Sequence, residues 1–403
     1  MRILFCSTAG AGHVGPLLPV ARSFAARGHE VLFLLPPEGR RLAADAGFAV
    51  HQAPPPDPAE NASIQDAISR DPTTMSLLMN RDYFGRLCTA ATLPAAEELC
   101  ANWKPDLVVH DGAEYASALA AHRAGIAHVQ LASALASVEW GSLHKYAAQE
   151  LAAFDPEAVR IIVESPYVTR LPESLDPSEY ARTIRYRAPE EAPSVAADEV
   201  PFDLAELAPE GTSLLYATLG SMAGNSQWSP GSYRVLLDAF ARLERSRPEI
   251  RVLLTVGRSL DPAALGVVPG NTRVAPWFPQ QRAFAAAKAV LSHGGSGTAY
   301  GALSAGLPGV FFPLFADQPH NARLIERAGA AIQVDTADLR KRGMPAAAEP
   351  ADRARLAALA EETAAAVAAV VGDPAYAARA GEIGAELNSL PSLESALGEY
   401  VPE

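Results

Sequence analysis

The chain has 403 residues, of which 49% are hydrophobic and 20% charged, and its formal net charge is −13. This length exceeds what one hydrophobic core usually supports, so we expect a soluble protein of two domains, each of about 200 residues. The acidic balance argues against nucleic acid or an anionic membrane surface as a partner.

The three cysteines, Cys6, Cys88 and Cys100, have no spacing typical of a metal site and cannot all pair. The chain begins with a short strand pattern rather than a signal peptide, and it contains no apolar run of about 18 residues. We therefore expect a reduced, cytoplasmic protein that neither enters nor crosses a membrane. The sequence does not decide the oligomeric state, and a homodimer is left open.

The first half alternates short apolar runs, typical of buried parallel strands, with helical patterns. The predicted strands cover residues 2–7, 30–35, 48–51, 107–110 and 128–131. The predicted helices cover residues 16–27, 38–46 and 112–124, and the first has a proline in its first turn. Such a series of strand–helix–strand units predicts an α/β fold with a parallel sheet.

Two longer stretches interrupt the alternation, at residues 53–101 and 134–176. The first opens with a proline-rich segment and continues as a helix broken by Pro72. Long insertions on a wound sheet often hold a ligand. Their apolar side chains either line a pocket or belong to the core, and the candidates for a pocket are Met75, Leu78, Met79, Tyr83, Phe84 and Trp140.

Residues 189–211 are rich in proline, glutamate and alanine without a clear period, which predicts a linker between two domains. The N-terminal domain covers residues 1–188, the C-terminal domain covers residues 212–385, and residues 386–403 form a tail that can pack back on the first domain. Ligands of open α/β sheets bind at the carboxyl ends of the strands. Two such edges facing one another across a cleft would hold two substrates.

The segment Gly10-Ala-Gly12-His13-Val-Gly15 matches the G-x-G-x-x-G fingerprint of dinucleotide-binding enzymes, after a strand and before a helix. That fingerprint also requires an acidic residue at the end of the second strand, where this chain has two prolines and Glu38 comes late. The mismatch disfavours a dinucleotide enzyme. It favours His13 as a neutral imidazole base at the mouth of a cleft.

Such a base needs an orienting partner, and Asp111 follows a predicted strand of the same sheet. The alternative is a capping box, because Asp111-Gly-Ala-Glu114 also fits the start of the next helix. Both roles can hold together. His110 points to the opposite face of its strand and is expected to be structural.

Residues 289–306 contain a predicted anion site, in which a short buried strand leads through a glycine-rich turn into a helix opening near Ser296. The N–H groups and the dipole of a helix N-terminus favour a phosphate, and glycines let the main chain approach it. The side chains of His293, Ser296 and Thr298 can donate further bonds. The Walker pattern is absent, so the alternative is an ordinary strand-to-helix turn.

With these residues placed, the whole chain resembles the bacterial natural-product branch of the UDP-glycosyltransferase-like family. The family has the GT-B fold, with two facing Rossmann-like domains, parallel sheets and an interdomain cleft. The resemblance implies His13 as the base, Asp111 as its partner, an N-terminal acceptor domain and a C-terminal nucleotide-sugar domain. It implies nucleotide and diphosphate contacts from Ser221, Trp277, Phe278, Gln280, His293, Gly294, Gly295, Ser296, Gly297 and Thr298, and sugar contacts from Asp317 and Gln318.

In relatives that use UDP-sugars, a glutamate near the start of the helix after the phosphate loop commonly holds both ribose hydroxyls, and Gly301 occupies that position here. The resemblance therefore favours a dTDP-linked donor carrying a deoxyhexose. No Asp-x-Asp occurs in the sequence, so we expect no metal cofactor. Dipoles and hydrogen bonds must then stabilise the leaving diphosphate.

We therefore expect an inverting, metal-independent glycosyltransferase. It moves a sugar from a dTDP-sugar to a hydroxyl of a small hydrophobic natural product, such as a polyketide antibiotic. The pocket candidates named above then bind the acceptor. The alternatives are a UDP-sugar-dependent transferase of the same family, a nicotinamide oxidoreductase, a nucleotide-sugar epimerase and a non-catalytic helper protein.

Overall fold

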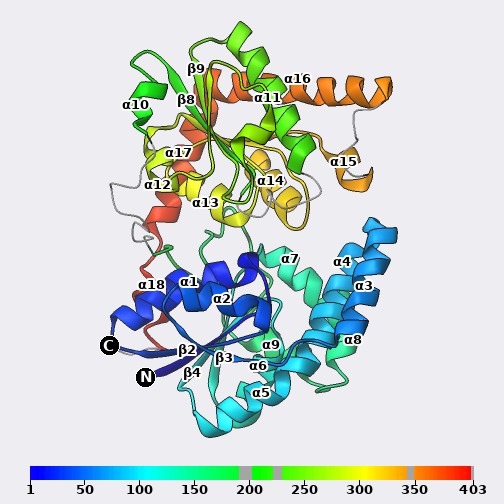
Figure 1. The fold of residues 1–403 in the computed structure, drawn as a ribbon. Helices are drawn as coiled ribbons and strands as arrows, with labels where there is room; N and C mark the ends of the chain where they lie inside the picture. The colour runs from blue at the N-terminus through cyan, green and yellow to red at the C-terminus, as the bar shows by residue number, and fades with distance from the viewer. Residues whose placement is uncertain (190–201, 221–228, 343–348, 401–403) are drawn as a thin grey trace. The chain divides into compact units, whose positions relative to one another are not determined.

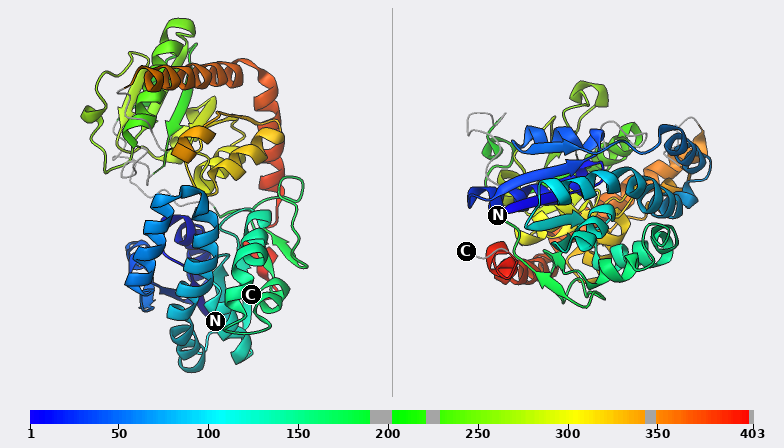
Figure 2. Two further views of the ribbon diagram at one scale, coloured as in Figure 1. Left: turned by 90° about the vertical axis from the view of Figure 1, so that its right-hand side faces the viewer. Right: turned by 90° about the horizontal axis from the view of Figure 1, so that it is seen from below.

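The computed structural model describes residues 1–189, 202–220, 229–342 and 349–400. The chain divides into two compact units, unit 1 made of Met1–Glu191 with Ser389–Glu403, and unit 2 made of Ala192–Asn388. Both chain ends therefore belong to unit 1 (Figures 1 and 2). Each unit contains one parallel sheet, which confirms the predicted α/β class. Among the described residues, no helix combines the length and apolar character needed to span a membrane.

Unit 1 contains a seven-stranded parallel sheet with the order β3-β2-β1-β4-β5-β6-β7. Its strands are β1 (Arg2–Cys6), β2 (Glu30–Leu35), β3 (Ala49–Gln52), β4 (Leu107–Asp111), β5 (Ala127–Leu131), β6 (Tyr167–Thr169) and β7 (Thr183–Arg185). The order reverses between β1 and β4, because the chain winds outward from β1 in one direction and later from β4 in the other. In open α/β sheets this reversal leaves the crevice where ligands bind.

Apolar side chains pack on both faces of this sheet. One face carries α1 (Ala11–Ala26), α2 (Pro37–Asp45) and α18 (Leu393–Leu397), and the other carries α5 (Thr89–Asn102) and α6 (Ala116–Ala124). The insertion after β3 forms α3 (Pro58–Arg70), η1 (Pro72–Thr74), α4 (Met75–Leu78) and the π-helix η2 (Met79–Cys88). The insertion after β5 forms α7 (Ala136–Gly141), the π-helix η3 (Ser142–Ala147), α8 (Ala148–Leu151) and α9 (Ala158–Glu164).

Unit 2 repeats this winding in a six-stranded parallel sheet with the order β10-β9-β8-β11-β12-β13. Its strands are β8 (Ser213–Thr218), β9 (Ile250–Thr255), β10 (Thr272–Ala275), β11 (Ala289–Ser292), β12 (Gly309–Phe311) and β13 (Ala331–Gln333). Its helices are α10 (Leu204–Leu207), α11 (Ser229–Ser246), η6 (Pro262–Leu265), α12 (Gln280–Ala286), α13 (Ser296–Ser304), α14 (Gln318–Arg327), α15 (Ala337–Arg342), α16 (Pro350–Gly372) and α17 (Pro374–Ser389). The reversal falls between β8 and β11.

The first helix begins earlier than predicted. The sequence predicts a start near residue 16, but α1 begins at Ala11, after Gly10 with a φ of 110° that favours glycine. Pro16 and Pro19 therefore lie inside the helix rather than at its start. Pro16 is the sixth residue of the helix, so its missing N–H group removes the hydrogen bond that this position would donate to the carbonyl oxygen of Gly12. This early start places His13 in the first turn of α1.

Short elements were also missed. The sequence analysis did not predict β6 and β7, because three residues each are too few to show a period. Within the predicted linker, α10 forms, and Phe202 and Leu207 pack on the core of unit 2.

The C-terminal helix α18 buries Leu393 and Leu397 in the core of unit 1, beside α1. Replacing Leu393 by alanine should lower the free energy of unfolding of unit 1 by about 2–5 kcal/mol, because the core loses apolar burial and gains a cavity. Hydrogen exchange at the amides of β1 and β4 measures this loss. Ser395→Ala, at an exposed position of the same helix, is the control and should leave protection unchanged. Equal protection in both variants would contradict this packing.

Candidate active site

The first group of candidate residues lies at the carboxyl end of the unit 1 sheet, where the strand order reverses between β1 and β4. His13 stands in the first turn of α1, shortly after β1, and Asp111 is the last residue of β4. The winding of the sheet therefore brings together two side chains that lie 98 residues apart in the sequence.

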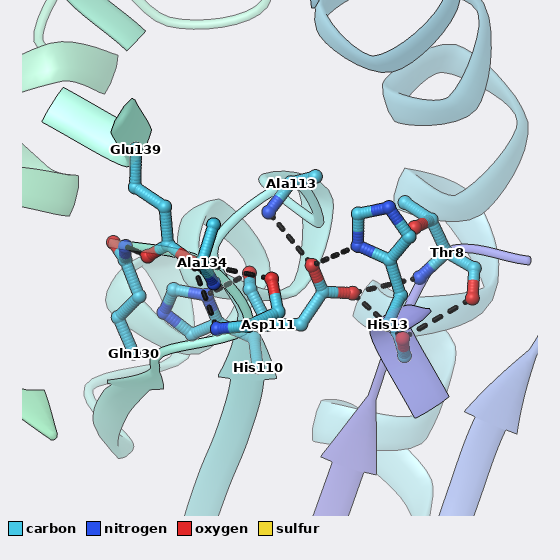
Figure 3. A network of polar contacts seen from close by, with 10 residues as sticks. Thr8, His13, His110, Asp111, Ala113, Gln130, Ala134 and Glu139 are labelled. Carbon is cyan, nitrogen blue, oxygen red and sulfur yellow. Dashed lines mark hydrogen bonds and ion pairs between the residues drawn. The ribbon is translucent and has the colours of Figure 1, made fainter. Parts of the chain in front are cut away.

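The Asp111 carboxylate is buried and accepts hydrogen bonds on both oxygens (Figure 3). Its Oδ1 accepts from His13 Nδ1 at 3.1 Å and from the N–H group of Ala113 at 2.8 Å. Its Oδ2 accepts from the Ser7 hydroxyl at 2.6 Å and from the N–H group of Thr8 at 2.9 Å. Burial alone raises the pKa of Asp111, but the charge of His13 and these hydrogen bonds outweigh burial and lower it to about 2.

An ionised carboxylate only accepts hydrogen bonds, so Nδ1 of His13 carries a proton and Nε2 is the basic nitrogen of the neutral ring. The His13 side chain is 28% exposed, whereas that of Asp111 is fully covered. The ring of Phe84 packs against His13, with centroids 5.3 Å apart. Asp111 can therefore hold the ring in one tautomer and stabilise the imidazolium after proton uptake.

Asp111 does not cap the next helix, so the capping-box alternative was wrong. The helix α6 begins only at Ala116, and the Asp111 side chain instead bonds the N–H group two residues on, in a tight turn. Glu114 accepts the N–H group of Ser117, within the first turn of α6. The residues between Asp111 and Ala116 therefore form a turn that separates β4 from α6.

A second buried carboxylate, Glu139 on α7, lies against this turn (Figure 3). It accepts Gln130 Nε2 at 2.9 Å and two N–H groups of the loop after β5 at 2.8 and 2.7 Å. A Cβ at Gly112 would lie 2.3 Å from this carboxyl group, so the turn beside Asp111 depends on glycine. Burial raises the pKa of Glu139 to about 7, although these hydrogen bonds oppose the shift.

His110 is buried in the sheet, beside the ring of His128 at a centroid distance of 5.7 Å. Burial lowers the pKa of His110 to about 4, so this imidazole is neutral at physiological pH. This placement agrees with the structural role expected for it.

The pocket candidates divide into separate groups. Tyr83 and Met79 lie on η2, where they pack against the small core of Ile64, Ile68 and Leu87. Tyr83 also contacts Phe84, with ring centroids 5.2 Å apart, and Phe84 in turn contacts His13. The structure therefore brings η2 to the proposed base, with Phe84 as the direct neighbour.

Trp140 and Met75 lie elsewhere. Trp140, on α7, stacks on His144 with centroids 4.0 Å apart and meets the edge of Tyr180 at 5.1 Å. Met75 is exposed on α4. The aromatic contact to His13 is made by Phe84 instead.

The second group lies at the corresponding reversal of the unit 2 sheet, between β8 and β11. The predicted helix start at Ser296 is confirmed, since α13 follows β11 after a turn of His293, Gly294 and Gly295. The N–H groups in the first turn of a helix have no intrahelical acceptor, and the helix dipole is positive there. The loop therefore has the geometry of an anion site.

His293 fills a slot that only glycines leave open. A Cβ would lie 2.7 Å from its ring at Gly220 and 2.4 Å from it at Gly295. Gly294 has a φ of 84°, and a Cβ there would lie 2.9 Å from the carbonyl oxygen of Gln318. Burial lowers the pKa of His293 to about 4, although Asp317 opposes the shift. The ring is thus neutral, and the local positive potential comes from backbone dipoles.

The residues predicted to contact the nucleotide differ in how deeply they are buried. Trp277 is half-buried, and the Arg258 guanidinium lies over its ring at 5.1 Å. Gln280 Nε2 donates to the Thr298 hydroxyl at 3.2 Å, which ties the start of α12 to α13. Phe278 is only 2% exposed and belongs to the unit 2 core. Ser221 lies outside the described residues, and Gly297 is exposed on α13.

The predicted sugar residues begin α14. Asp317 Oδ2 accepts the Ser296 hydroxyl at 2.8 Å, so the structure joins this carboxylate to the glycine-rich loop. Gln318 is buried, and its Oε1 accepts the N–H groups of Leu314 and Phe315 at 2.8 and 3.1 Å. Its oxygen is therefore occupied by the loop that precedes Asp317.

Two residues of this site escaped the sequence analysis. Arg258 is far from Trp277 in the sequence, and no pattern joins them. Asn321 donates to Asp317 Oδ2 at 2.7 Å. Its position four residues after Asp317, on the same helix face, was the signal that could have found it. In the part of the chain that the structure describes, no group of three or more His, Cys, Asp or Glu residues could hold a metal ion.

Comparison with known proteins places these sites in a family. The family described as UDP-glucoronosyl and UDP-glucosyl transferase matches residues 213–351, which include the whole glycine-rich loop. The L-demethylnoviosyl transferase of Streptomyces niveus is 30% identical over 351 residues, covering 84% of this chain and 87% of that protein. The oleandomycin glycosyltransferase of Streptomyces antibioticus is 28% identical, covering 83% of this chain and 79% of that protein.

Solved structures agree on the fold. The spinosyn rhamnosyltransferase SpnG, solved with thymidine diphosphate, has a TM-score of 0.75 at 20% identity, and the match covers 100% of both chains. The same enzyme solved with spinosyn aglycone has a TM-score of 0.76 at 19% identity, again over 100% of both chains. The GT-B fold implied by the sequence resemblance is therefore confirmed. The chain belongs to the UDP-glycosyltransferase-like family and is a glycosyltransferase.

Proposed function

We propose that this glycosyltransferase moves a deoxysugar from a dTDP-sugar to a hydroxyl of a small hydrophobic natural product, with inversion and without a metal ion. The observation that carries the proposal is the His13–Asp111 pair, in which a buried anion fixes a partly exposed imidazole at the edge of the unit 1 sheet. A general base of this kind typically contributes about 10²–10⁴-fold to a rate.

In the proposed reaction, His13 Nε2 takes the proton of the acceptor hydroxyl, and the imidazolium is stabilised by Asp111. The acceptor oxygen forms a bond to the anomeric carbon while the bond from that carbon to the diphosphate oxygen breaks. Attack from the face opposite the leaving group inverts the anomeric centre. The departing dTDP carries the negative charge of the broken bond.

The glycine-rich loop before α13 is the proposed diphosphate site. Its support is the helix N-terminus at Ser296 and the close backbone approach at Gly294 and Gly295. Preorganised N–H donors of this kind stabilise developing charge without reorganisation during the reaction. Trp277 is the proposed stacking surface for the base, and Asp317 the proposed acceptor for sugar hydroxyls.

Two observations support dTDP over UDP. Gly301 offers no carboxylate for a ribose, and a Cβ at this position would lie 3.1 Å from the Phe284 ring, so little room exists for a side chain. SpnG was solved with thymidine diphosphate. For the acceptor, the names of the two Streptomyces relatives support a natural product of the antibiotic class. Phe84 and Tyr83 are the side chains we place closest to its reacting hydroxyl.

Replacing His13 by alanine should lower the rate of transfer by about 10²–10⁴-fold, because the acceptor hydroxyl loses its base. The affinity for dTDP, measured by calorimetry, should not change. His122→Ala, an exposed position on α6, is the control and should transfer at the wild-type rate. Wild-type turnover by His13→Ala, read by mass spectrometry, would remove His13 from the mechanism.

Replacing Asp111 by asparagine should lower kcat by about 10²–10⁴-fold, because the imidazolium loses its stabilising anion. Folding lowers the pKa of Asp111 from 3.8 to about 2, so its ionised form stabilises the fold above pH 3.8, and this contribution is lost as the pH falls through about 2. The stability difference between wild type and variant should therefore shrink in that acidic window, measured by chemical unfolding. A constant difference between about pH 2 and 5 would contradict the ionised assignment.

Calorimetry with dTDP and UDP should show tighter binding of dTDP, because neither ribose hydroxyl of UDP meets a carboxylate at position 301. A panel of dTDP- and UDP-sugars with matched hexoses, read by mass spectrometry, should give the same order in kcat/KM. Tighter binding of UDP would overturn the assignment that rests on Gly301.

A further inference from the structure

The side chain of Asn321 lies at the centre of the unit 2 site, although the proposed function gives it no role. It is fully buried on α14, one helical turn after Asp317. Its Nδ2 donates to the carbonyl oxygen of Gly294 at 2.9 Å and to Asp317 Oδ2 at 2.7 Å, and it lies 3.3 Å from the Ser296 hydroxyl. The side chain thus joins the glycine-rich loop to the start of α14.

The orientation of this amide follows from its neighbours. The Gly294 carbonyl and the Asp317 carboxylate can only accept, so the NH₂ group must face them. The Tyr300 hydroxyl donates to Asn321 Oδ1 at 2.6 Å, from α13. The amide therefore uses both of its hydrogens and its oxygen, and a flipped amide would lose the bonds to Gly294 and Asp317.

Asp317 is held from two sides by this network. Its Oδ2 accepts both the Asn321 amide at 2.7 Å and the Ser296 hydroxyl at 2.8 Å. The preceding Ala316 has a φ of 53°, an uncommon conformation for a residue with a side chain. Such a conformation persists where the surroundings determine it strongly. The carboxylate therefore has one position relative to the glycine-rich loop.

We propose that Asn321 is a positioning residue for the nucleotide-sugar donor. It holds Asp317 and the Gly294–Ser296 turn in one register, so that the sugar hydroxyls and the diphosphate of one ligand are recognised together. This inference rests on the proposed function of the two groups that Asn321 joins. Asn321 itself is buried and acts through Asp317 and the loop rather than by touching the donor.

Asn321→Ala should raise the donor KM or lower kcat, reducing donor kcat/KM by about 10–100-fold, because small misplacements at a reacting centre have effects of this size. Tyr300→Phe is the matched control, since it removes the bond to Oδ1 and leaves the two NH₂ bonds in place. It should reduce donor kcat/KM by less than about threefold. The acceptor KM should stay the same in both variants.

A double-mutant cycle tests whether Asn321 acts through Asp317. In the Asp317→Ala background, Asn321→Ala should reduce donor kcat/KM by a smaller factor than it does alone, because coupled residues are not additive and only the contact with the loop remains to be lost. Independent effects that multiply would overturn the proposal, as would a wild-type donor kcat/KM in the Asn321→Ala single variant. Where Asn321→Ala fails to fold, Asn321→Asp keeps the size of the side chain and presents a carboxylate to the same two acceptors. It should lose donor kcat/KM to a similar degree.

The outcomes for this inference and for the proposed function can be told apart. A wild-type protein that neither binds dTDP in calorimetry nor transfers from any donor would overturn the proposed function. Wild-type transfer that Asp317→Ala impairs and Asn321→Ala leaves intact, at equal melting temperature, would overturn only the role of Asn321.

Discussion

The candidate site of unit 1 depends on the hydrogen bond between His13 and the buried carboxylate of Asp111. It requires β1 and β4 to be neighbours, which the outward winding of the sheet from its centre provides. It also requires the Asp111 carboxylate to stay ionised although it is completely buried. The hydrogen-bond donors of Ser7, Thr8 and Ala113 compensate this carboxylate for the hydration that it loses. Fold and electrostatics therefore act together, since the same strand ends supply both the position and the donors.

The proposed diphosphate site of unit 2 lies at the same topological position as the His13–Asp111 pair of unit 1, where the strand order reverses. Its loops meet where β8 and β11 are neighbours, but the positive potential there comes from the N-terminus of α13, because the His293 ring is neutral and packed between glycines. This arrangement suits a protein whose net charge is −13. A phosphate must be recognised by local backbone geometry when the overall field repels it.

The two insertions of unit 1 contain π-helices. The π-helices η2 and η3 pack together at Gly85, where a Cβ would lie 3.1 Å from the Cβ of Ala147. Extended π-helical turns are rare and often occur at functional sites. Here they bring Phe84 to His13. In the proposed function, η2 therefore supplies side chains of the acceptor site.

The sequence alone determined the alternating α/β pattern, the helix start at Ser296 and the glycines around it, because these features depend on residues close together in the chain. It also paired His13 with Asp111, through their places after two strands of the same sheet, and it assigned the family through its motifs. Only the tertiary structure decided that α1 starts at Ala11, that β6 and β7 extend the sheet, and that Leu393 completes the unit 1 core. The sequence also did not predict the packing of Glu139 against Gly112, or the hydrogen bonds by which Asn321 joins Gly294 to Asp317. Such contacts join residues from separate elements, and their chemistry depends on distances that no spacing along the chain encodes.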